Sequence, residues 1–430
     1  MTFQYQRLAE QLAHKIYQHE LQTQQKLSSL REFARQQNIS LSTAQQCYEL
    51  LEAKGLIYVK AKSGYFVNSR HYQSAVPDSP QFESKARQVS NLDLQNQIQT
   101  ASIQNNLTPL GAIQLSPHLI PVDGLRRSLQ RALKHCQPED FLYCNKQGHQ
   151  HLRQALSDHW REDGIYVATE DIFISNGCMP ALSLLIQQIS QEGDSILIPT
   201  PTFNGQLQML ASLKRNIIEI PADHRGIDLE RLEFFMQQGS AKLCLLTANF
   251  QNPLGYCLNN EQKQQIARLA QKYQCFILED DIYGECSFQK ERPLPVRYWD
   301  QEGYVIWCGS VSKSLSTAYR VGWFCLGRQL QHLRPQLLAN NVGVNTPLQL
   351  GLADFIYSRG YREHLDRLRP KLMQQVEQYR AYILECFHGI PIALSQSQGG
   401  YALWMQLPES ITGLELYYMA QAQGINIVPG

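Results

Sequence analysis

The chain has 430 residues, of which 43% are hydrophobic, and its formal net charge is +1. This length predicts two or three domains, and this composition is sufficient for a sizeable core. The balanced charge excludes a strongly acidic or basic protein. The sequence shows neither an apolar signal region nor a membrane-spanning stretch, so we expect a cytoplasmic protein without a membrane partner.

Eleven cysteines are present, and no two of them are three residues apart. An odd count at irregular spacing argues against a disulfide framework and against a zinc site, so we expect no bound metal. Cys244 and Cys275 lie in apolar runs and are predicted to fill the core.

Charge and composition divide the chain into three regions. Residues 1–75 hold nine Lys or Arg residues and five Glu residues, so this part is mildly basic and the remainder mildly acidic. We predict a compact head over residues 1–68, a polar linker rich in Gln and Ser over 69–106, and a body over 107–430. Within the linker, residues 93–103 could form a short helix.

The head begins with a helical pattern. Apolar residues repeat every four positions in its first helix: Leu8, Leu12 and Ile16. "SLRE" (29–32) and "STAQ" (42–45) each place Glu or Gln three residues after a Ser, which is the capping box that opens a helix. A second and a third helix are therefore predicted.

The third helix leads into a β-hairpin. Its inner face is predicted to carry three residues: Ala44, Tyr48 and Leu51. Gly55 would end it in the left-handed conformation typical of helix C-termini. Two apolar pieces, 56–60 and 64–67, then flank a basic turn that contains Lys62.

Three short helices followed by a basic hairpin form a winged helix-turn-helix, whose third helix fits the major groove of double-stranded DNA. Side chains at the start of that helix would contact base edges: Ser42, Thr43 and Gln45. Arg31 and Lys62 are better placed for phosphates. A three-helix interaction module is the alternative. The pattern over residues 4–68 resembles the GntR superfamily head, although Leu41 stands where many members carry Arg, which would alter base contacts.

The body alternates between short apolar runs and helical stretches. Strands are expected at residues 171–175, 195–200, 216–220, 242–248, 275–280, 304–309 and 321–327. Near-continuous apolar strands that alternate with helices indicate an α/β fold with a mostly parallel, buried sheet. Ligands of such sheets bind at the carboxyl ends of the strands.

Distinctive polar residues follow these predicted strands. "SNGCMP" (175–180) places a Gly where a helix begins, which suits an anion, and further polar motifs follow at 248–255, 279–285 and 309–313. A lysine alone would be a surface charge, but Lys313 shares this edge with an anion turn, an Asn, an Asp/Tyr pair and Arg320. A phosphate-bearing cofactor with an aldehyde would use all of these groups, because the lysine amine can form an imine with the aldehyde.

In combination these residues resemble fold-type I pyridoxal-phosphate enzymes, the aspartate aminotransferase superfamily, from about residue 115 to residue 430. The resemblance implies pyridoxal 5′-phosphate as cofactor and Lys313 as the Schiff-base lysine. Asp280 would pair with the pyridine nitrogen, and Tyr283 and Asn252 would bind the ring hydroxyl. Phe203 would stack on the ring.

The resemblance also implies a phosphate site and a dimer. The phosphate would be held by Ser310, Ser312 and Arg320 and by the backbone turn at Gly177 and Cys178. Tyr143 is similar to the tyrosine that reaches a neighbouring subunit's phosphate, so a homodimer is expected.

Two departures from this family are visible. "STAY" (316–319) replaces the Pro-Gly turn common before the phosphate Arg, which would alter the loop without removing the charge. The sequence ends at "INIVPG" (425–430), where the resemblance implies a further stretch with an Arg for the substrate's α-carboxylate. We therefore expect either a truncated sequence or compromised amino-acid binding.

A GntR-like head joined to an aminotransferase-like body resembles the MocR-type transcriptional regulators. The resemblance implies a regulator that binds operator DNA and senses an amino compound, or the vitamin itself, through an aldimine on Lys313. One alternative is a working aminotransferase with a secondary DNA-binding head, in which half-transamination is plausible. The other is a repressor that uses the cofactor only as structural filler.

Overall fold

The structure is a computed structural model, and it describes residues 4–17, 21, 25–60, 63–67, 75–90, 92–101, 107–143, 145–340 and 343–430. The chain divides into two compact units. Unit 1 contains Met1–Val76 and Pro370–Leu394, and unit 2 contains Pro77–Arg369 and Ser395–Gly430. None of the helices in the described ranges is long and apolar enough to cross a bilayer.

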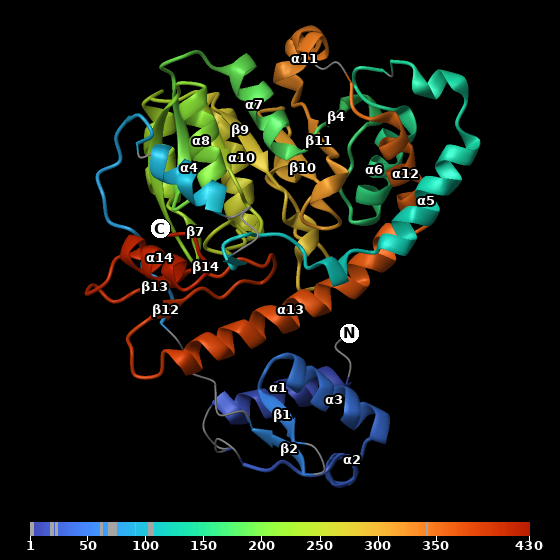
Figure 1. Ribbon diagram of the computed structural model, residues 1–430, viewed down its shortest axis with the longest axis vertical. Helices are drawn as coiled ribbons and strands as arrows, with labels where there is room; N and C mark the ends of the chain where they lie inside the picture. Colours follow the sequence, from blue (N-terminus) through green and yellow to red (C-terminus); the bar gives the residue numbers. More distant parts are fainter. Residues whose placement is uncertain are drawn as a thin grey trace. The chain divides into compact units, whose positions relative to one another are not determined.

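The head in unit 1 consists of three helices and a hairpin, as the sequence predicts (Figure 1). Its elements are α1 (Gln4–Tyr17), α2 (Leu30–Gln37), α3 (Leu41–Ala53), β1 (Ile57–Lys60) and β2 (Gly64–Val67). The two strands pair antiparallel, with Ile57 opposite Val67. The predicted inner face of α3 is confirmed, since Ala44, Tyr48 and Leu51 are all buried in the core of the head.

The ends of the head helices confirm one predicted cap and correct another. The Ser29 hydroxyl accepts from the Glu32 amide at the start of α2, at 3.2 Å. The prediction that Ser42 opens α3 is wrong, because Ser40 Oγ accepts from the Thr43 amide at 3.1 Å and the helix begins at Leu41. Both serines offer the same hydroxyl, and the earlier one caps the helix. Gly55 follows α3 with φ 67°, as expected.

Unit 2 is built on an eight-stranded sheet. In spatial order its strands are β4 (Ile172–Ser175), β11 (Gly322–Cys325), β10 (Val305–Ser310), β9 (Phe276–Asp280), β8 (Leu243–Leu246), β5 (Ser195–Thr200), β6 (Asn216–Asp223) and β7 (Gly226–Ile227). The strands from β10 to β6 are parallel, whereas β11 runs antiparallel to both β10 and β4. Each predicted strand of the body is present, and the α/β fold is confirmed.

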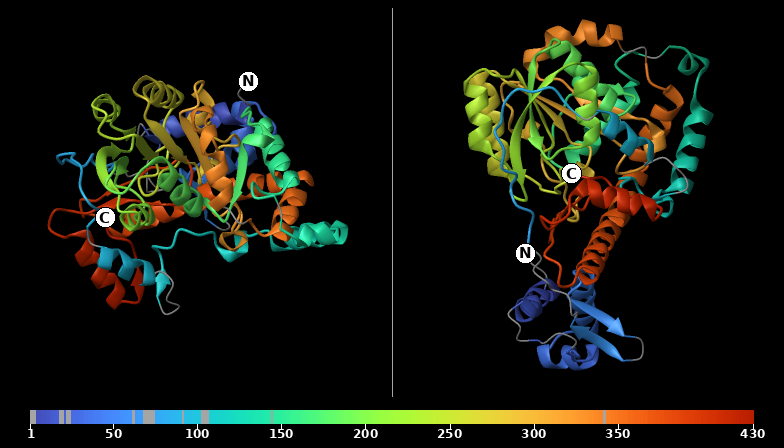
Figure 2. Two further views of the ribbon diagram at one scale, coloured as in Figure 1. Left: turned by 90° about the horizontal axis from the view of Figure 1, so that it is seen from above. Right: turned by 60° about the vertical axis from the view of Figure 1, so that its left-hand side comes forward.

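Helices cover both faces of this sheet (Figures 1 and 2). The α-helices after the head are α4 (Leu92–Ala101), α5 (Val122–His135), α6 (Gln150–Glu162), α7 (Cys178–Ile189), α8 (Asn204–Ser212), α9 (Leu229–Gln237), α10 (Asn260–Tyr273), α11 (Arg334–Asn340), α12 (Thr346–Tyr357), α13 (Gly360–Cys386) and α14 (Gly413–Ala422). The 3₁₀ helices are η1 (Pro117–Leu119), η2 (Pro138–Phe141), η3 (Thr169–Asp171), η4 (Gly284–Cys286), η5 (Val296–Trp299), η6 (Thr317–Tyr319) and η7 (Arg328–Leu333). Short strands are β3 (Thr108–Pro109), β12 (Ala393–Leu394), β13 (Met405–Gln406) and β14 (Ile425–Asn426).

Alternation along each strand produces two core layers. On β5, Ile196 and Ile198 pack in one buried cluster with residues of α7 and α8. Leu197 points to the other face and packs with residues of α9 and α10. Successive strand residues face opposite sides of a sheet, so a strand covered on both faces is apolar throughout. The apolar runs of the sequence have this origin.

The region expected to be a linker contains ordered segments. Helix α4 coincides with the short helix expected at 93–103. The backbone of Arg87 pairs with Ile217 on β6, at 2.9 and 2.8 Å, and its guanidinium forms an ion pair with Glu219. Residues around Arg87 therefore lie along the edge of the body sheet.

Candidate cofactor site

The polar residues singled out in the body lie at one edge of the sheet. Strand β4 is parallel to β9 and β10, because it is antiparallel to β11, which is itself antiparallel to β10. The carboxyl ends of these three strands therefore meet. Gly177 follows β4, Asp280 ends β9, and Lys313 comes three residues after the end of β10. The topology thus brings these polar residues to one edge of the sheet, where ligands of such folds bind.

Asp280 is buried and held by two donors. The Cys178 thiol donates to Oδ1 at 3.2 Å, and the Gln206 amide donates to Oδ2 at 3.0 Å. Burial raises the pKa of the Asp280 carboxyl, while both hydrogen bonds oppose that rise. The arrangement fixes the carboxylate in one orientation and leaves it able to share a proton with a partner.

Lys313 is half-buried, within electrostatic range of this carboxylate. Burial lowers the pKa of its amine, and the negative charges that Cys286 and Asp280 can carry oppose this. Nζ donates to the Ile113 carbonyl and lies 6.0 Å from the centre of the Tyr283 ring. A lysine with a lowered pKa has a larger share of neutral amine, the form that attacks an aldehyde.

Tyr283 and Asn252, which the sequence assigned to one ligand, are in contact. Tyr283 is buried, and burial raises the pKa of its phenol. A hydrogen bond with the Asn252 side chain opposes this rise. The ring of Tyr401 packs against Tyr283 edge to face, with the ring centres 6.0 Å apart.

The glycine turn after β4 is closely packed. Gly177 has φ 103°, and a Cβ added there would lie 2.5 Å from Arg320 Nη2. Arg320 itself donates to the Asn176 carbonyl at 2.8 Å. Gly322 lies beneath the turn, since a Cβ on it would lie 2.5 Å from the Gly177 carbonyl carbon. The cation and the helix N-terminus are thus brought together, as an anion site requires.

Two hydroxyls adjoin the same turn. Ser310 is opposite Gly322 in the sheet register, and Gly322 is in turn opposite Ser175. The Ser310 and Ser312 hydroxyls are 2.8 Å apart, and Ser310 also donates to the Val321 carbonyl at 2.9 Å. Ser310 therefore lies next to the glycine turn, and Ser312 is in contact with Ser310.

The two predicted aromatic residues lie in different settings. Phe203 is the N-cap residue of α8 and is 42% exposed. The helix it precedes also carries Gln206, the partner of Asp280. Tyr143 is 92% exposed. Its contact with a neighbouring subunit stays a prediction.

Sequence reasoning missed two residues of this site, Gln206 and Ile113, and the side-chain contact of Cys178. Gln206 follows Phe203 by three residues, a spacing that puts both on one helix face and could have revealed it. Cys178 was chosen for its backbone, whereas its thiol contacts Asp280. Ile113 contributes only a carbonyl oxygen, so no side-chain motif could have identified it.

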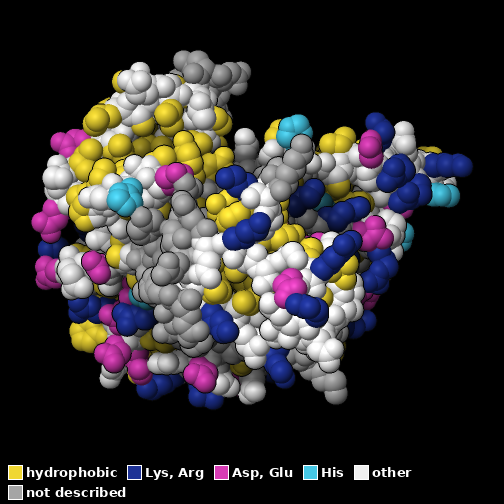
Figure 3. Space-filling model, turned by 90° about the horizontal axis from the view of Figure 1, so that it is seen from below, with side chains coloured by type: hydrophobic (Ala, Val, Ile, Leu, Met, Phe, Trp, Pro, Cys, Tyr) yellow, Lys and Arg dark blue, Asp and Glu magenta, His cyan; other side chains and the backbone are white. Residues whose placement is uncertain are grey.

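The head presents its predicted DNA contacts to solvent. Arg31, Ser42 and Gln45 are exposed, and Thr43 is half-buried in the first turn of α3. The Gln45 amide donates to Glu49 at 2.8 Å. Lys62 lies outside the described residues. Figure 3 shows exposed Lys and Arg side chains on the face of the molecule drawn there.

Both parts of the chain match known protein families. Residues 114–430 match the family "Aminotransferase class I and II". Residues 4–67 match "Bacterial regulatory proteins, gntR family", a family of DNA-binding heads. The first match contains every side chain assigned to the site, and the second contains the three helices and the hairpin of the head.

Relatives with the same two parts span nearly the whole chain. The HTH-type transcriptional regulator YdcR of Escherichia coli K12 is 32% identical over 428 residues, which cover 99% of this chain and 91% of that protein. The regulator YjiR of the same organism is 31% identical, with 95% and 87% covered. The regulator NorG of Staphylococcus aureus USA300 is 27% identical, with 94% and 92% covered.

Solved structures share the fold of the body. A kynurenine aminotransferase from Pyrococcus horikoshii, crystallised with pyridoxamine phosphate, superposes with a TM-score of 0.71 at 23% identity, covering 79% of this chain and 85% of that chain. The α-aminoadipate aminotransferase LysN from Thermus thermophilus gives 0.68 at 23% identity, with 76% and 83% covered.

The aminotransferase match supports pyridoxal 5′-phosphate as the cofactor of the body, in agreement with the sequence-based prediction. The relatives add what the fold alone does not, namely the fusion of this body to a DNA-binding head. On these grounds the chain belongs to the MocR-type transcriptional regulators, which join a GntR-family head to an aminotransferase class I and II domain.

Proposed function

We propose that this regulator senses a small amino compound, or the vitamin itself, through pyridoxal 5′-phosphate joined to Lys313, and adjusts its binding to an operator in double-stranded DNA accordingly. The observation that carries the proposal is the position of Lys313. Its amine has a pKa lowered by burial, is within electrostatic range of the Asp280 carboxylate and lies 6.0 Å from the centre of the Tyr283 ring.

The residues present fit the cofactor. Bound there, pyridoxal phosphate supplies an aldehyde that bonds to amines and a ring that withdraws electrons. Asp280 would hold the ring nitrogen and its proton, and Tyr283 with Asn252 would hold the ring hydroxyl. The phosphate would be held by Ser310, Ser312, Arg320 and the amides of Gly177 and Cys178, and Phe203 would cover the ring.

Lys313 would serve as a reversible attachment point. If an amino compound took its place on the cofactor, the amine of Lys313 would be free and could accept a proton at Nζ. Burial favours the neutral form of that amine. Ligand and DNA must each favour one of two states of the protein for such an exchange to change DNA affinity.

A homodimer is part of the proposal. Phe141, Leu142 and Tyr143 form a consecutive run that is 64%, 70% and 92% exposed. Large aromatic and aliphatic side chains in such a run suit burial against another protein surface. We propose that this surface belongs to a second copy of the chain and that Tyr143 reaches the phosphate held by that copy.

The rival function is a working aminotransferase with a secondary head. It is favoured by the same grouping of Lys313, Asp280 and Tyr283, which is all that amine exchange requires. Rapid turnover of amino acids, together with the absence of tight binding to any DNA sequence, would support the rival and overturn our proposal.

Absorbance and DNA binding test the proposal together. With pyridoxal phosphate, the unsubstituted protein should show a visible band that borohydride fixes, and Lys313→Ala should lack it while binding the same DNA. Lys272→Ala, which alters an exposed lysine paired with Glu233, is the matched control and should keep the band. Added amino compounds should shift DNA affinity in gel-shift assays only for proteins that carry Lys313.

A further inference from the structure

The backbone next to Lys313 is fixed by a set of buried side chains. The Lys313 carbonyl accepts from the Tyr401 hydroxyl at 3.2 Å and from the Cys286 thiol at 3.5 Å. The next residue, Ser314, is fully buried and makes two further hydrogen bonds to helix α13. Its hydroxyl lies 2.6 Å from the Tyr361 hydroxyl, and its carbonyl lies 2.8 Å from His364 Nε2.

The chemistry of these partners determines which group donates the hydrogen bond between Ser314 and His364. A carbonyl oxygen only accepts, so Nε2 of His364 carries the hydrogen and donates it to Ser314. Burial lowers the pKa of His364 to about 4, which keeps the ring neutral near pH 7. Burial also raises the pKa of the Tyr361 phenol, so that its hydrogen stays in place. Both hydrogen bonds are therefore present throughout the neutral pH range.

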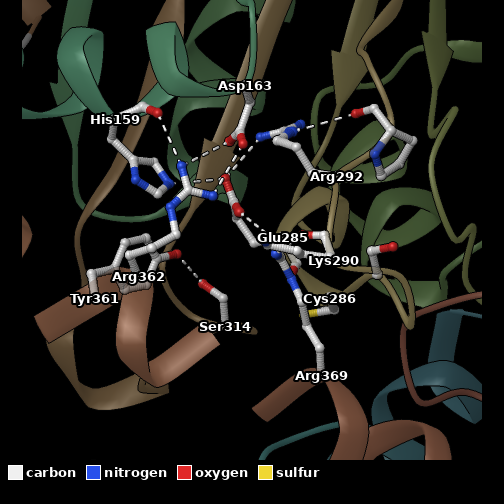
Figure 4. Close-up of polar contacts among 12 residues, drawn as sticks. His159, Asp163, Glu285, Cys286, Lys290, Arg292, Ser314, Tyr361, Arg362 and Arg369 are labelled. Atoms are coloured by element: carbon white, nitrogen blue, oxygen red, sulfur yellow. Dashed lines mark hydrogen bonds and ion pairs between the residues drawn. The ribbon is translucent and has the colours of Figure 1, made fainter. Parts of the chain in front are cut away.

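Helix α13 is itself anchored where these two residues lie. Arg369 donates to the Glu285 carbonyl at 3.0 Å and its carboxylate at 3.1 Å, and Arg292 donates to the same carboxylate at 3.0 Å. Arg362 pairs with Asp163, the residue that follows α6, at 3.0 Å. Figure 4 shows these groups converging around Glu285, with the Ser314–Tyr361 contact beside them.

This cluster is an ion-pair network. His159, Asp163 and Glu285 bring potential metal ligands within 4.8 Å of one another. Guanidinium groups of Arg292, Arg362 and Arg369 already neutralise those carboxylates, so a metal cation would meet positive charge. The network therefore makes the start of α13 a rigid support for Ser314.

We propose that Tyr361 and His364 are positioning residues for Lys313, which hold the Lys313–Ser314 backbone so that the amine stays within reach of the cofactor's aldehyde. The inference rests on the proposed function, since it needs Lys313 to bond to that aldehyde. A lysine side chain has four rotatable bonds, so the backbone to which it is attached decides how often Nζ meets its target.

If Tyr361 and His364 act in this way, non-covalent binding of the cofactor and bond formation by Lys313 should respond differently to their loss. Binding of the phosphate and ring depends on Arg320, the glycine turn, Asp280, Ser310 and Ser312. None of the hydrogen bonds described for these groups involves Tyr361 or His364. Bond formation by Lys313 depends on its backbone. Loss of either support should slow bond formation and leave non-covalent binding nearly unchanged.

The experiment measures the two steps separately on the full chain. Stopped-flow absorbance follows bond formation with pyridoxal phosphate, and equilibrium titration measures affinity for pyridoxamine phosphate, which has no aldehyde. Tyr361→Phe and His364→Leu should each slow bond formation about tenfold, the factor that one lost buried hydrogen bond commonly costs. Affinity for pyridoxamine phosphate should stay within about twofold, and His364→Gln, which retains an N–H donor, should restore much of the rate.

Two exposed residues of the same types serve as controls. Tyr379→Phe and His332→Leu alter exposed residues of the same types and should change neither step. Unchanged rates in Tyr361→Phe and His364→Leu, or parallel losses of rate and pyridoxamine phosphate affinity, would overturn the inference. If His364→Leu does not fold, Tyr361→Phe decides the question because it removes a single oxygen atom. An unsubstituted protein without any visible band would instead overturn the proposed function, and this inference with it.

Discussion

The thiol of Cys178 lies 3.2 Å from a carboxylate oxygen of Asp280 and donates a hydrogen bond to it. Cys178 is the first residue of α7, and Asp280 is the last residue of β9. The bond therefore joins the turn assigned to the phosphate with the group assigned to the ring nitrogen. Two anchors of one ligand are fixed relative to each other before that ligand arrives.

Removal of this bond should weaken cofactor binding. Cys178→Ala leaves a buried carboxylate oxygen without its donor, which costs about 1–3 kcal/mol. Part of that cost should appear as an affinity for pyridoxal phosphate about five- to tenfold lower, measured by equilibrium titration. Cys386→Ala, at an exposed thiol, is the control. Equal affinities in Cys178→Ala and the unsubstituted protein would show that the contact does not support the ligand.

The cation beside the glycine turn should be specific for phosphate. Arg320→Ala should lower affinity for pyridoxal phosphate by about tenfold or more, because charge-assisted hydrogen bonds contribute roughly twice as much as neutral ones. Affinity for pyridoxal, which has no phosphate, should hardly change. Arg328→Ala, at an exposed arginine paired with Glu302, is the matched control. A similar loss for both forms of the vitamin would count against the phosphate assignment.

Acid should weaken the contribution of His364 to stability. Its pKa is lowered by burial from 6.5 to about 4, so the unfolded chain binds the proton more readily between these values. The free energy of unfolding should therefore fall as the pH drops from 6.5 towards 4, by about 1.4 kcal/mol per pH unit for this group. Denaturant titrations should show the cost of His364→Gln shrinking by about 2 kcal/mol between pH 7 and pH 5.

The matched control for this prediction is His332→Gln, because His332 is exposed. The pH dependence of the cost of His364→Gln is measured against that of His332→Gln. A cost of His364→Gln that stays constant over this range would mean that the buried ring does not titrate as expected.

Substitutions in the head should separate overall affinity for DNA from preference for a DNA sequence. Arg31→Ala should weaken binding to every DNA sequence and reduce the slope of log K against log salt by about 0.9. Gln45→Ala should leave that slope unchanged and alter the preference for bases, since Gln45 is an exposed residue in the second turn of α3. Gel shifts at several salt concentrations, with specific and random DNA, measure both. A smaller slope in Gln45→Ala would contradict its assignment to base edges.

The positions of strands and of the polar residues at their ends could be predicted from the sequence, because short stretches of neighbouring residues determine them. Strands such as β5 are apolar throughout because both faces are covered, so their positions could be predicted. Lys313, Asp280 and Gly177 stand at strand ends, and a parallel sheet collects its strand ends at one edge. The cap of α3 was predicted at Ser42, whereas Ser40, two residues earlier, caps the helix.

Contacts between distant segments could not be predicted. His364 and Tyr361 are about fifty residues away from Ser314, and helix α13 contains many charged residues that suggest a solvated face. Their partners are a backbone carbonyl and a serine hydroxyl, which leave no periodic signal. The thiol of Cys178 was missed for the same reason, since Asp280 is more than a hundred residues away.

The exposure of Tyr143 has a consequence for physiology. If this ring completes the pocket of a second copy, an isolated chain would hold its vitamin poorly. Occupancy would then rise with the amount of the protein in the cell, and dilution would release the vitamin. A response of this kind would depend on how strongly the regulator's own gene is expressed as well as on nutrient supply.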